Sequence, residues 1–285
     1  MPDLFEQELA AGSMFFSVWA TMLVFVGLGA WLHALVHRKW LVAVKGPPPE
    51  WKPPLADFAL LGIALLLALV IVGPLIAVEI IRLLPGHPEE LSEWAFLLQS
   101  LSMQGTILLT LGLFWKFQPK TFETVGGKPS RGLFYAAKWG AYGFVLAIPL
   151  VALANIVTIF LFNHFGWEFS LQETVEEIVS VESTLLFLLM PLPVVILAPL
   201  WEEIVFRGGL FRYLKNCLPG SLALLLSAIC FSLIHGQPAQ FGGILILGLI
   251  LALVYQKSGS LLAPILMHAF FNANTLLGLF FLRFL

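Results

Sequence analysis

The chain has 285 residues, of which 59% are hydrophobic and only 11% are charged, and its mean hydropathy is +0.94. These values lie far outside the range of soluble domains and predict a polytopic membrane protein, with the lipid bilayer as its surroundings. The formal net charge of -2 favours neither nucleic acid nor an acidic partner. The N-terminus lacks the basic leader of a secretory signal peptide, so we expect the first apolar run to remain in the mature chain.

Eight apolar segments predict an all-α bundle of about eight transmembrane helices. A helix rises 1.5 Å per residue, so about 20 residues cross a hydrocarbon core roughly 30 Å thick. The first four segments are Met14–Val36, Leu55–Leu84, Trp94–Trp115 and Leu133–Phe162. The last four are Thr184–Lys215, Pro219–His235, Phe241–Tyr255 and Leu261–Leu282. Pro74 is expected to kink the second segment, and Pro191, Pro193 and Pro199 interrupt the fifth.

The segments divide into two predicted units, and the basic residues predict their orientation. Residues 1–163 hold four spans without a recognisable motif, and residues 184–285 hold four spans that carry the polar motifs described below. Lys and Arg accumulate in cytoplasmic loops. With the N-terminus outside, the inner loops would hold Arg38, Lys39, Lys45, Lys52, Lys116, Lys120, Lys128, Arg131, Lys138 and Lys257. We therefore expect both termini to lie outside.

Three ionisable residues, Glu202, Glu203 and Arg207, lie within the fifth apolar segment. A charge at membrane depth is costly, and its default interpretation is functional. At about 100° per residue, Glu203 and Arg207 share one helix face and can pair, whereas Glu202 points in a neighbouring direction. The alternative is an interfacial helix end, but Arg212 and Lys215 continue the helical pattern beyond these charges. We expect Arg207 to hold Glu203 and to leave Glu202 free.

Three further polar residues, His235, His268 and Asn272, occur in the last three segments. His235 could simply mark a helix boundary before Gly236, and His268 and Asn272, at i and i+4, could be interhelical hydrogen-bonding residues. Counted from the cytoplasmic ends of their helices, Glu202, His235 and His268 lie about 20, 22 and 12 Å deep. These depths allow the side chains to meet in one layer. Such a layer has a base for water and donors for an oxyanion, as amide hydrolysis requires.

The same residues form three motifs that resemble those of the CAAX prenyl protease 2 and bacteriocin-processing family of intramembrane proteases, the CPBP or Abi family. The motifs are Glu202-Glu203-x-x-x-Arg207, Phe231-x-x-x-His235 and His268-x-x-x-Asn272, and the resemblance covers roughly Leu185–Asn274.

The resemblance implies an integral-membrane endopeptidase whose site is reached from the cytoplasmic side. Its substrate would be a peptide or a membrane protein, membrane-associated or CAAX-like, and its location the cell membrane if the source is bacterial. By the same resemblance, Glu202 and His235 would activate water, His268 and Asn272 would bind the oxyanion, and Glu203 and Arg207 would support the carboxylate. We expect no metal or other cofactor, because the sequence has no H-E-x-x-H motif and the glutamate mechanism needs none.

Two other functions stay open. A non-catalytic membrane scaffold or bacteriocin-immunity factor could keep the polar layer for packing alone. A transporter with Glu203 and Arg207 in a coupling site is less favoured, because no inverted repeat is visible.

Overall fold

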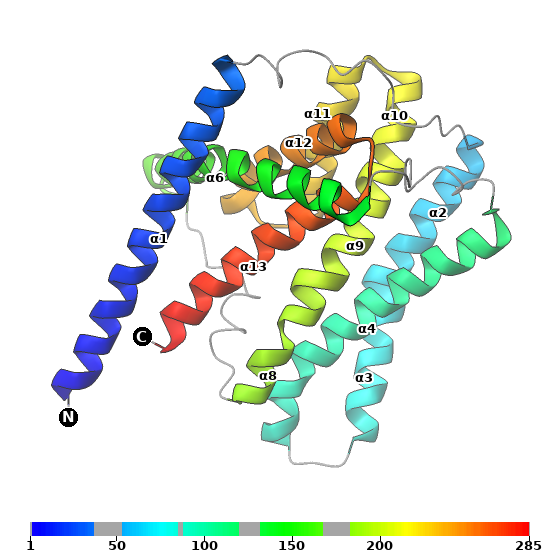
Figure 1. Ribbon diagram of the computed structural model, residues 1–285. Helices are drawn as coiled ribbons and strands as arrows, with labels where there is room; N and C mark the ends of the chain where they lie inside the picture. Colours follow the sequence, from blue (N-terminus) through cyan, green and yellow to red (C-terminus); the bar gives the residue numbers. More distant parts are fainter. Residues whose placement is uncertain (1, 37–52, 85–87, 120–131, 168–182, 285) are drawn as a thin grey trace.

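The computed structural model describes residues 2–36, 53–84, 88–119, 132–167 and 183–284. Within these ranges the chain forms helices and no β-strand, which confirms the all-α prediction. Figure 1 shows the helices side by side in a bundle, with the N-terminus and the C-terminus toward its lower end.

The described residues of the first half of the chain form five α-helices. They are α1 (Pro2–Val36), α2 (Leu55–Leu67), α3 (Gly73–Leu83), α4 (Pro88–Phe117) and α6 (Gly132–Phe165). A π-helical turn, η1 (Ala68–Val72), joins α2 to α3 without a break.

From residue 183 to residue 284, the chain forms one composite helical segment and three further α-helices. The composite segment consists of α8 (Thr184–Leu189), the π-helix η3 (Leu192–Leu197), α9 (Ala198–Glu203), the π-helix η4 (Ile204–Phe211) and α10 (Arg212–Cys217). It is followed by α11 (Gly220–Ile234), the 3-10 turn η5 (Pro238–Gln240), α12 (Phe241–Ser258) and α13 (Leu262–Phe284).

Seven helical segments in the described ranges are long and apolar enough to cross a membrane. They are Ser17–Val36, Leu55–Leu83, Trp94–Phe117, Gly132–Phe165, Thr184–Cys217, Pro238–Ser258 and Leu262–Phe281. The remaining predicted span is helix α11, which is apolar but only 15 residues long. At 1.5 Å per residue α11 covers about 22 Å, which is less than the hydrocarbon thickness of about 30 Å.

Pro74 and Pro199 follow π-helical turns instead of sharp breaks, whereas Pro149 lies within α6 without such a turn. A proline within a helix has no N–H for the carbonyl four residues earlier, and its ring crowds that carbonyl. The turn η1 comes immediately before Gly73 and Pro74, and η3 precedes Pro199 by two residues. A wider turn relieves the crowding while the helix continues, and π-helical turns are often found at functional sites.

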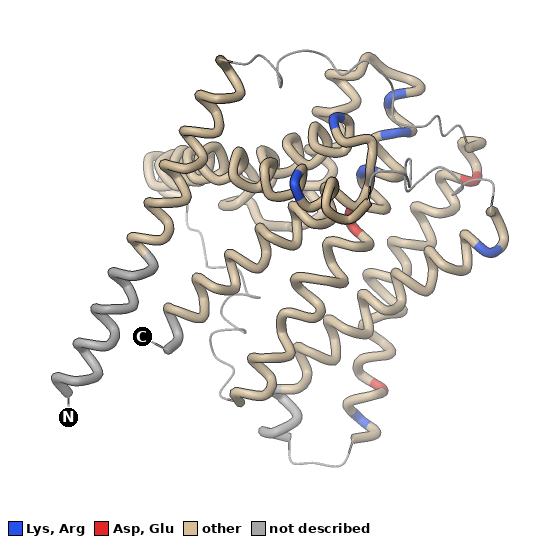
Figure 2. Tube along the Cα trace, viewed as in Figure 1, with Lys and Arg blue, Asp and Glu red and all other residues tan. Residues whose placement is uncertain are grey.

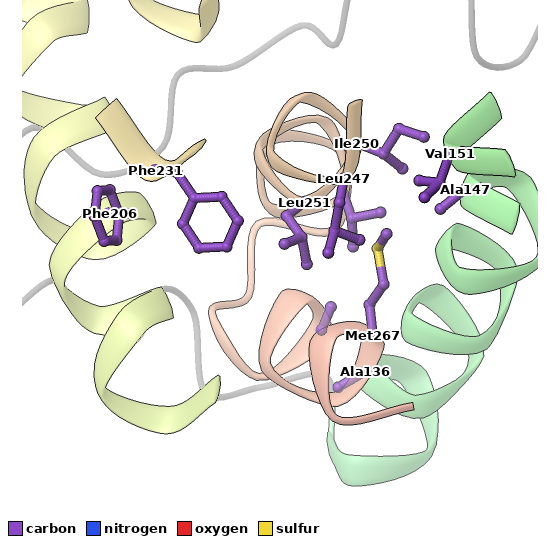
Figure 3. Packing of buried hydrophobic residues seen from close by; sticks show 11 residues of the cluster. Ala136, Ala147, Val151, Phe206, Phe231, Leu247, Ile250, Leu251 and Met267 are labelled. Carbon is purple, nitrogen blue, oxygen red and sulfur yellow. The ribbon is translucent and has the colours of Figure 1, made fainter. Parts of the chain in front are cut away.

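Helix α9 lies at the centre of the bundle, between α4 and α13 (Figure 1). One buried hydrophobic cluster joins α2, α4, α9 and α11 around Trp201, and a second joins α4, α8 and α13 around Met190. The third cluster joins α6, η4, α11, α12 and α13, and includes Phe206, Phe231 and Met267 (Figure 3). Because all three clusters contain part of the composite segment or contact it, its position is set from several sides.

Two glycines bring α6 close to α12 and α13. A Cβ on Gly140 would lie 3.0 Å from both the carbonyl oxygen of Ala263 and the amide nitrogen of Met267, and one on Gly143 would lie 2.5 Å from a Val254 methyl group. Small residues at such crossings allow backbones in membranes to approach closely. Since Met267 precedes His268, this contact helps to set the position of His268.

Charged residues lie mostly near one end of the bundle. Figure 2 shows most Lys and Arg positions of the described ranges toward the upper end, where α4 and α10 finish. Lys116, Lys215 and Lys257 occupy the last turns of α4, α10 and α12, whereas Arg82 is in the last turn of α3, at the lower end. The other predicted loop residues, in 37–52 and 120–131, fall outside the described residues, as does part of the boundary between the two predicted units.

Candidate active site

Glu203 and Arg207 form an ion pair in the interior of the protein. Arg207 Nη1 lies 2.7 Å from Glu203 Oε1, and both side chains are 0% exposed. Arg207 Nη2 also donates a hydrogen bond to the carbonyl oxygen of Gly248 in α12, at 3.1 Å. The predicted pairing and its burial are therefore confirmed, and the alternative of an interfacial helix end is wrong. No sequence signal identified the Gly248 carbonyl, because a backbone acceptor can belong to any residue.

The two motif residues of α13, His268 and Asn272, have different hydrogen-bond partners. His268 Nδ1 lies 3.0 Å from Glu203 Oε1, so this carboxylate joins α13 to the composite segment. Asn272 Nδ2 donates to the carbonyl oxygen of Val194 in η3, at 2.8 Å. The predicted interhelical hydrogen bonding is thus present for both residues.

The carboxylate of Glu202 lies near both histidines of the site, His235 and His268. Its Oε2 lies 3.9 Å from His235 Nε2 and 3.9 Å from His268 Nε2. The Glu202 side chain is 11% exposed and that of His235 is 25% exposed, which makes this side of the layer the more accessible one. The predicted meeting of Glu202, His235 and His268 is confirmed by these distances.

His235 reaches this position from a helix end. It follows the last residue of α11, and Gly236 continues with φ of +62°, a left-handed conformation that suits glycine. The His235 Nδ1 atom lies 2.6 Å from the carbonyl oxygen of Phe231, one turn earlier. The interpretation as a helix-boundary residue is therefore correct, and the residue also faces Glu202.

The hydrogen bonds assign the protons on the two imidazoles. A carbonyl oxygen only accepts, so His235 Nδ1 must donate to Phe231. A carboxylate paired with arginine also accepts, so His268 Nδ1 donates to Glu203. In neutral imidazoles both Nε2 atoms are then acceptors, and both face the acceptor Glu202 Oε2, which has no hydrogen-bond partner among the described residues. The site is thus built to receive a group that brings donors.

The spacing of these acceptors differs from that of the ligands in a zinc site. Tetrahedral zinc with ligands at about 2.0–2.1 Å holds neighbouring ligand atoms about 3.4 Å apart. The two 3.9 Å separations are wider, and within the described ranges no group of three or more His, Cys, Asp or Glu residues is arranged to hold a metal ion. The side chains as placed do not match a zinc site. A mechanism without metal stays a prediction.

The fold and the site together define an integral, multi-pass membrane protein with a buried layer of Glu, His and Arg side chains. The sequence model of the type II CAAX prenyl endopeptidase Rce1-like family matches residues 184–274. This is nearly the segment, Leu185–Asn274, over which the three motifs were found. The match confirms the resemblance to the CAAX prenyl protease 2 and bacteriocin-processing family.

A curated relative supports the same family. The membrane-embedded CAAX protease MroQ of Staphylococcus aureus (strain USA300) is 28% identical over 148 residues. The aligned region makes up 48% of this chain and 56% of that relative, so the chain spans about half the length of the relative. No solved structure matches this chain significantly.

Proposed function

We propose that this protein is an intramembrane endopeptidase that hydrolyses a peptide bond with water activated by Glu202 and His235. The observation that carries this proposal is the convergence of Glu202 Oε2 with the Nε2 atoms of His235 and His268, each 3.9 Å away. A water molecule has two O–H donors and forms hydrogen bonds of about 2.8 Å, which can span two acceptors at this separation. Such a water would be oriented and polarised before the substrate arrives.

In the proposed reaction, Glu202 takes one proton from this water while the oxygen attacks the carbonyl carbon of the scissile peptide bond. The carbonyl π bond breaks and its oxygen becomes an oxyanion. When the intermediate collapses, the C–N bond breaks and Glu202 returns the proton to the leaving nitrogen. The products are a new carboxyl terminus and a new amine, and no redox partner is needed.

The oxyanion donors are proposed to come from α13. Asn272 has two N–H donors, and one of them is used by the Val194 carbonyl, so the second would serve the oxyanion. His268 donates from Nδ1 to Glu203, so it can donate from Nε2 only when it carries both protons. The buried set holds two carboxylates and one guanidinium, and a doubly protonated His268 would leave it without net charge. Glu203 and Arg207 would support this arrangement.

The substrate class is proposed from the family. The relative is named a membrane-embedded CAAX protease, and by analogy we propose a membrane-associated or CAAX-like peptide or membrane protein as the substrate. We also propose that the upper end of the bundle in Figure 2 is cytoplasmic, because basic residues concentrate there, and that both termini lie outside. In a bacterium the membrane would be the cell membrane. Residues 1–163 would then support a core formed by residues 184–285.

The test is cleavage of a proteome-derived peptide library by the detergent-purified protein and by Glu202→Gln. Glutamine keeps the shape of the side chain but removes the base, so cleavage should fall by about 10²-fold or more. Glu79→Gln is the matched control, because Glu79 is an exposed carboxylate in α3.

A parallel assay with a chelator tests the predicted absence of a metal. Cleavage that is lost in Glu202→Gln, kept in Glu79→Gln and insensitive to chelator would support the proposal. Equal cleavage by wild type and Glu202→Gln would contradict the role of Glu202 as the base, and no cleavage by either protein would favour the scaffold or immunity factor. Loss with chelator would contradict the metal-free mechanism.

A further inference from the structure

One buried aromatic residue of the site contacts the guanidinium group of Arg207 and the imidazole rings of both histidines. Phe231 in α11 is 0% exposed. The guanidinium carbon of Arg207 lies over its ring, 4.2 Å from the centroid. The ring centroids of His235 and His268 lie 4.8 and 5.7 Å from that of Phe231. The sequence marked Phe231 only as the first residue of a motif.

The geometry of these contacts is specific to an aromatic ring. The face of a benzene ring is electron-rich and attracts a cation, whereas its edge is electron-poor and prefers a tilted neighbour. Arg207 lies over the face. His235 and His268 are inclined to the ring at 65° and 76°, in edge-type contacts. An aliphatic side chain of similar size would fill the space but would offer neither interaction.

Phe231 also packs against a second aromatic ring. Phe206 packs against it edge-on, with centroids 5.2 Å apart, and Figure 3 shows both rings at the margin of the cluster that continues through α12 to α6. This support restricts the orientation of the Phe231 ring. A ring with a restricted orientation can in turn set the orientation of groups that rest on it.

We propose, on the basis of the proposed peptidase function, that Phe231 is the positioning residue of the site. Its face keeps Arg207 on Glu203, its ring sets the planes of His235 and His268 so that both Nε2 atoms point at Glu202, and its carbonyl holds the proton on His235 Nδ1. Phe231 does not touch the reacting atoms. It acts through the three side chains that lie against it.

The test distinguishes the contribution of the Phe231 ring from that of its backbone carbonyl and from that of apolar packing alone. Phe231→Leu keeps the carbonyl and an apolar side chain but removes the ring. Phe211→Leu is the matched control, because Phe211 is also 0% exposed and lies under a cation, Lys215 Nζ, 5.6 Å from its centroid, but has none of the site contacts described above. Both variants should lower the unfolding temperature in detergent by similar amounts.

The kinetic expectation differs between the two variants. Phe231→Leu should lower kcat by about tenfold or more with KM within about twofold, because misdirected imidazoles slow the chemical step and leave substrate binding intact. Phe211→Leu should keep kcat within about twofold of wild type. Equal effects of the two variants on kcat would overturn the proposal.

A second measurement covers the case in which Phe231→Leu does not fold. Replacing Phe231 with 3,4,5-trifluorophenylalanine keeps the ring and its shape but weakens the attraction of its face for a cation. We expect kcat to fall while the unfolding temperature changes little, and an unchanged kcat would overturn the proposal.

A third measurement does not depend on activity. In a double-mutant cycle with Phe231→Leu and Arg207→Met, the unfolding free energies should be non-additive, because the two side chains are in contact. If wild type and Glu202→Gln are equally inactive, the proposed function fails. The cycle then decides the positioning role by itself, and additive effects would overturn it.

Discussion

The buried ion pair between Glu203 and Arg207 gives a quantitative prediction for stability. Replacing Arg207 with methionine removes the guanidinium but keeps an apolar side chain of similar length. The pair is 0% exposed on both sides, so solvent does not screen it. Breaking a buried pair typically costs about 3–5 kcal/mol, because the remaining buried charge loses its countercharge. The Gly248 carbonyl also loses its donor, which costs about 1–3 kcal/mol more.

The assay is equilibrium unfolding of the detergent-solubilised protein, followed by far-UV circular dichroism. Arg207→Met should lower the free energy of unfolding by at least about 3 kcal/mol. The matched control is Arg82→Met, because Arg82 pairs with Glu79 at 3.8 Å on an exposed part of α3, with side chains 77% and 62% exposed. A surface pair of this kind contributes about 0–1 kcal/mol.

A second variant distinguishes the loss of attraction between the two side chains from the cost of a buried charge without its countercharge. In Glu203→Leu combined with Arg207→Met, neither charge is left alone, and stability should recover by a few kcal/mol relative to Arg207→Met. His268 Nδ1 loses its acceptor in this variant, so we expect stability to recover without activity. The reasoning would be refuted if Arg207→Met destabilised the protein no more than Arg82→Met does.

Two further predictions concern α13. Asn272→Ala removes the hydrogen bond to the Val194 carbonyl and should lower the free energy of unfolding by about 1 kcal/mol. If Asn272 also binds the oxyanion, kcat of this variant should fall by about 10²–10³-fold. An unchanged kcat would show that Asn272 serves packing alone. Gly140→Leu should displace α13 and sharply lower both stability and cleavage, since a Cβ there already lies 3.0 Å from the backbone of α13. Gly105→Leu, where a Cβ would meet nothing within 4 Å, should be tolerated, and equal effects in unfolding and cleavage assays would contradict the close-packing argument.

Local features of this protein could be predicted from sequence because they depend on helix geometry alone. The positions of the apolar helices follow from length and hydropathy, and most predicted ends lie within a few residues of those observed. The pairing of Glu203 with Arg207 follows from their i, i+4 spacing, which any helix brings onto one face. The meeting of Glu202 with the histidines was predicted from their approximate depths in the helices, and the distances of 3.9 Å show that these side chains meet.

Other features depend on how the helices pack. Helix α11 is only 15 residues long and ends next to His235, whereas the apolar run alone suggested a span that crosses the membrane. The bonds from Arg207 to the Gly248 carbonyl and from Asn272 to the Val194 carbonyl use backbone acceptors, which carry no residue-type signal.

The amino-acid sequence alone was enough to predict the all-α class of fold and the ion pair between Glu203 and Arg207, and it named the candidate residues of the site. Only the tertiary structure decided that His268 Nδ1 donates to Glu203, that both Nε2 atoms face Glu202, and that the Phe231 ring lies against Arg207 and both imidazoles. The physical reason is that helical periodicity specifies which side chains share a face. The rotation and crossing of neighbouring helices depend on the sum of many contacts distant in sequence, such as those of Gly140 with α13.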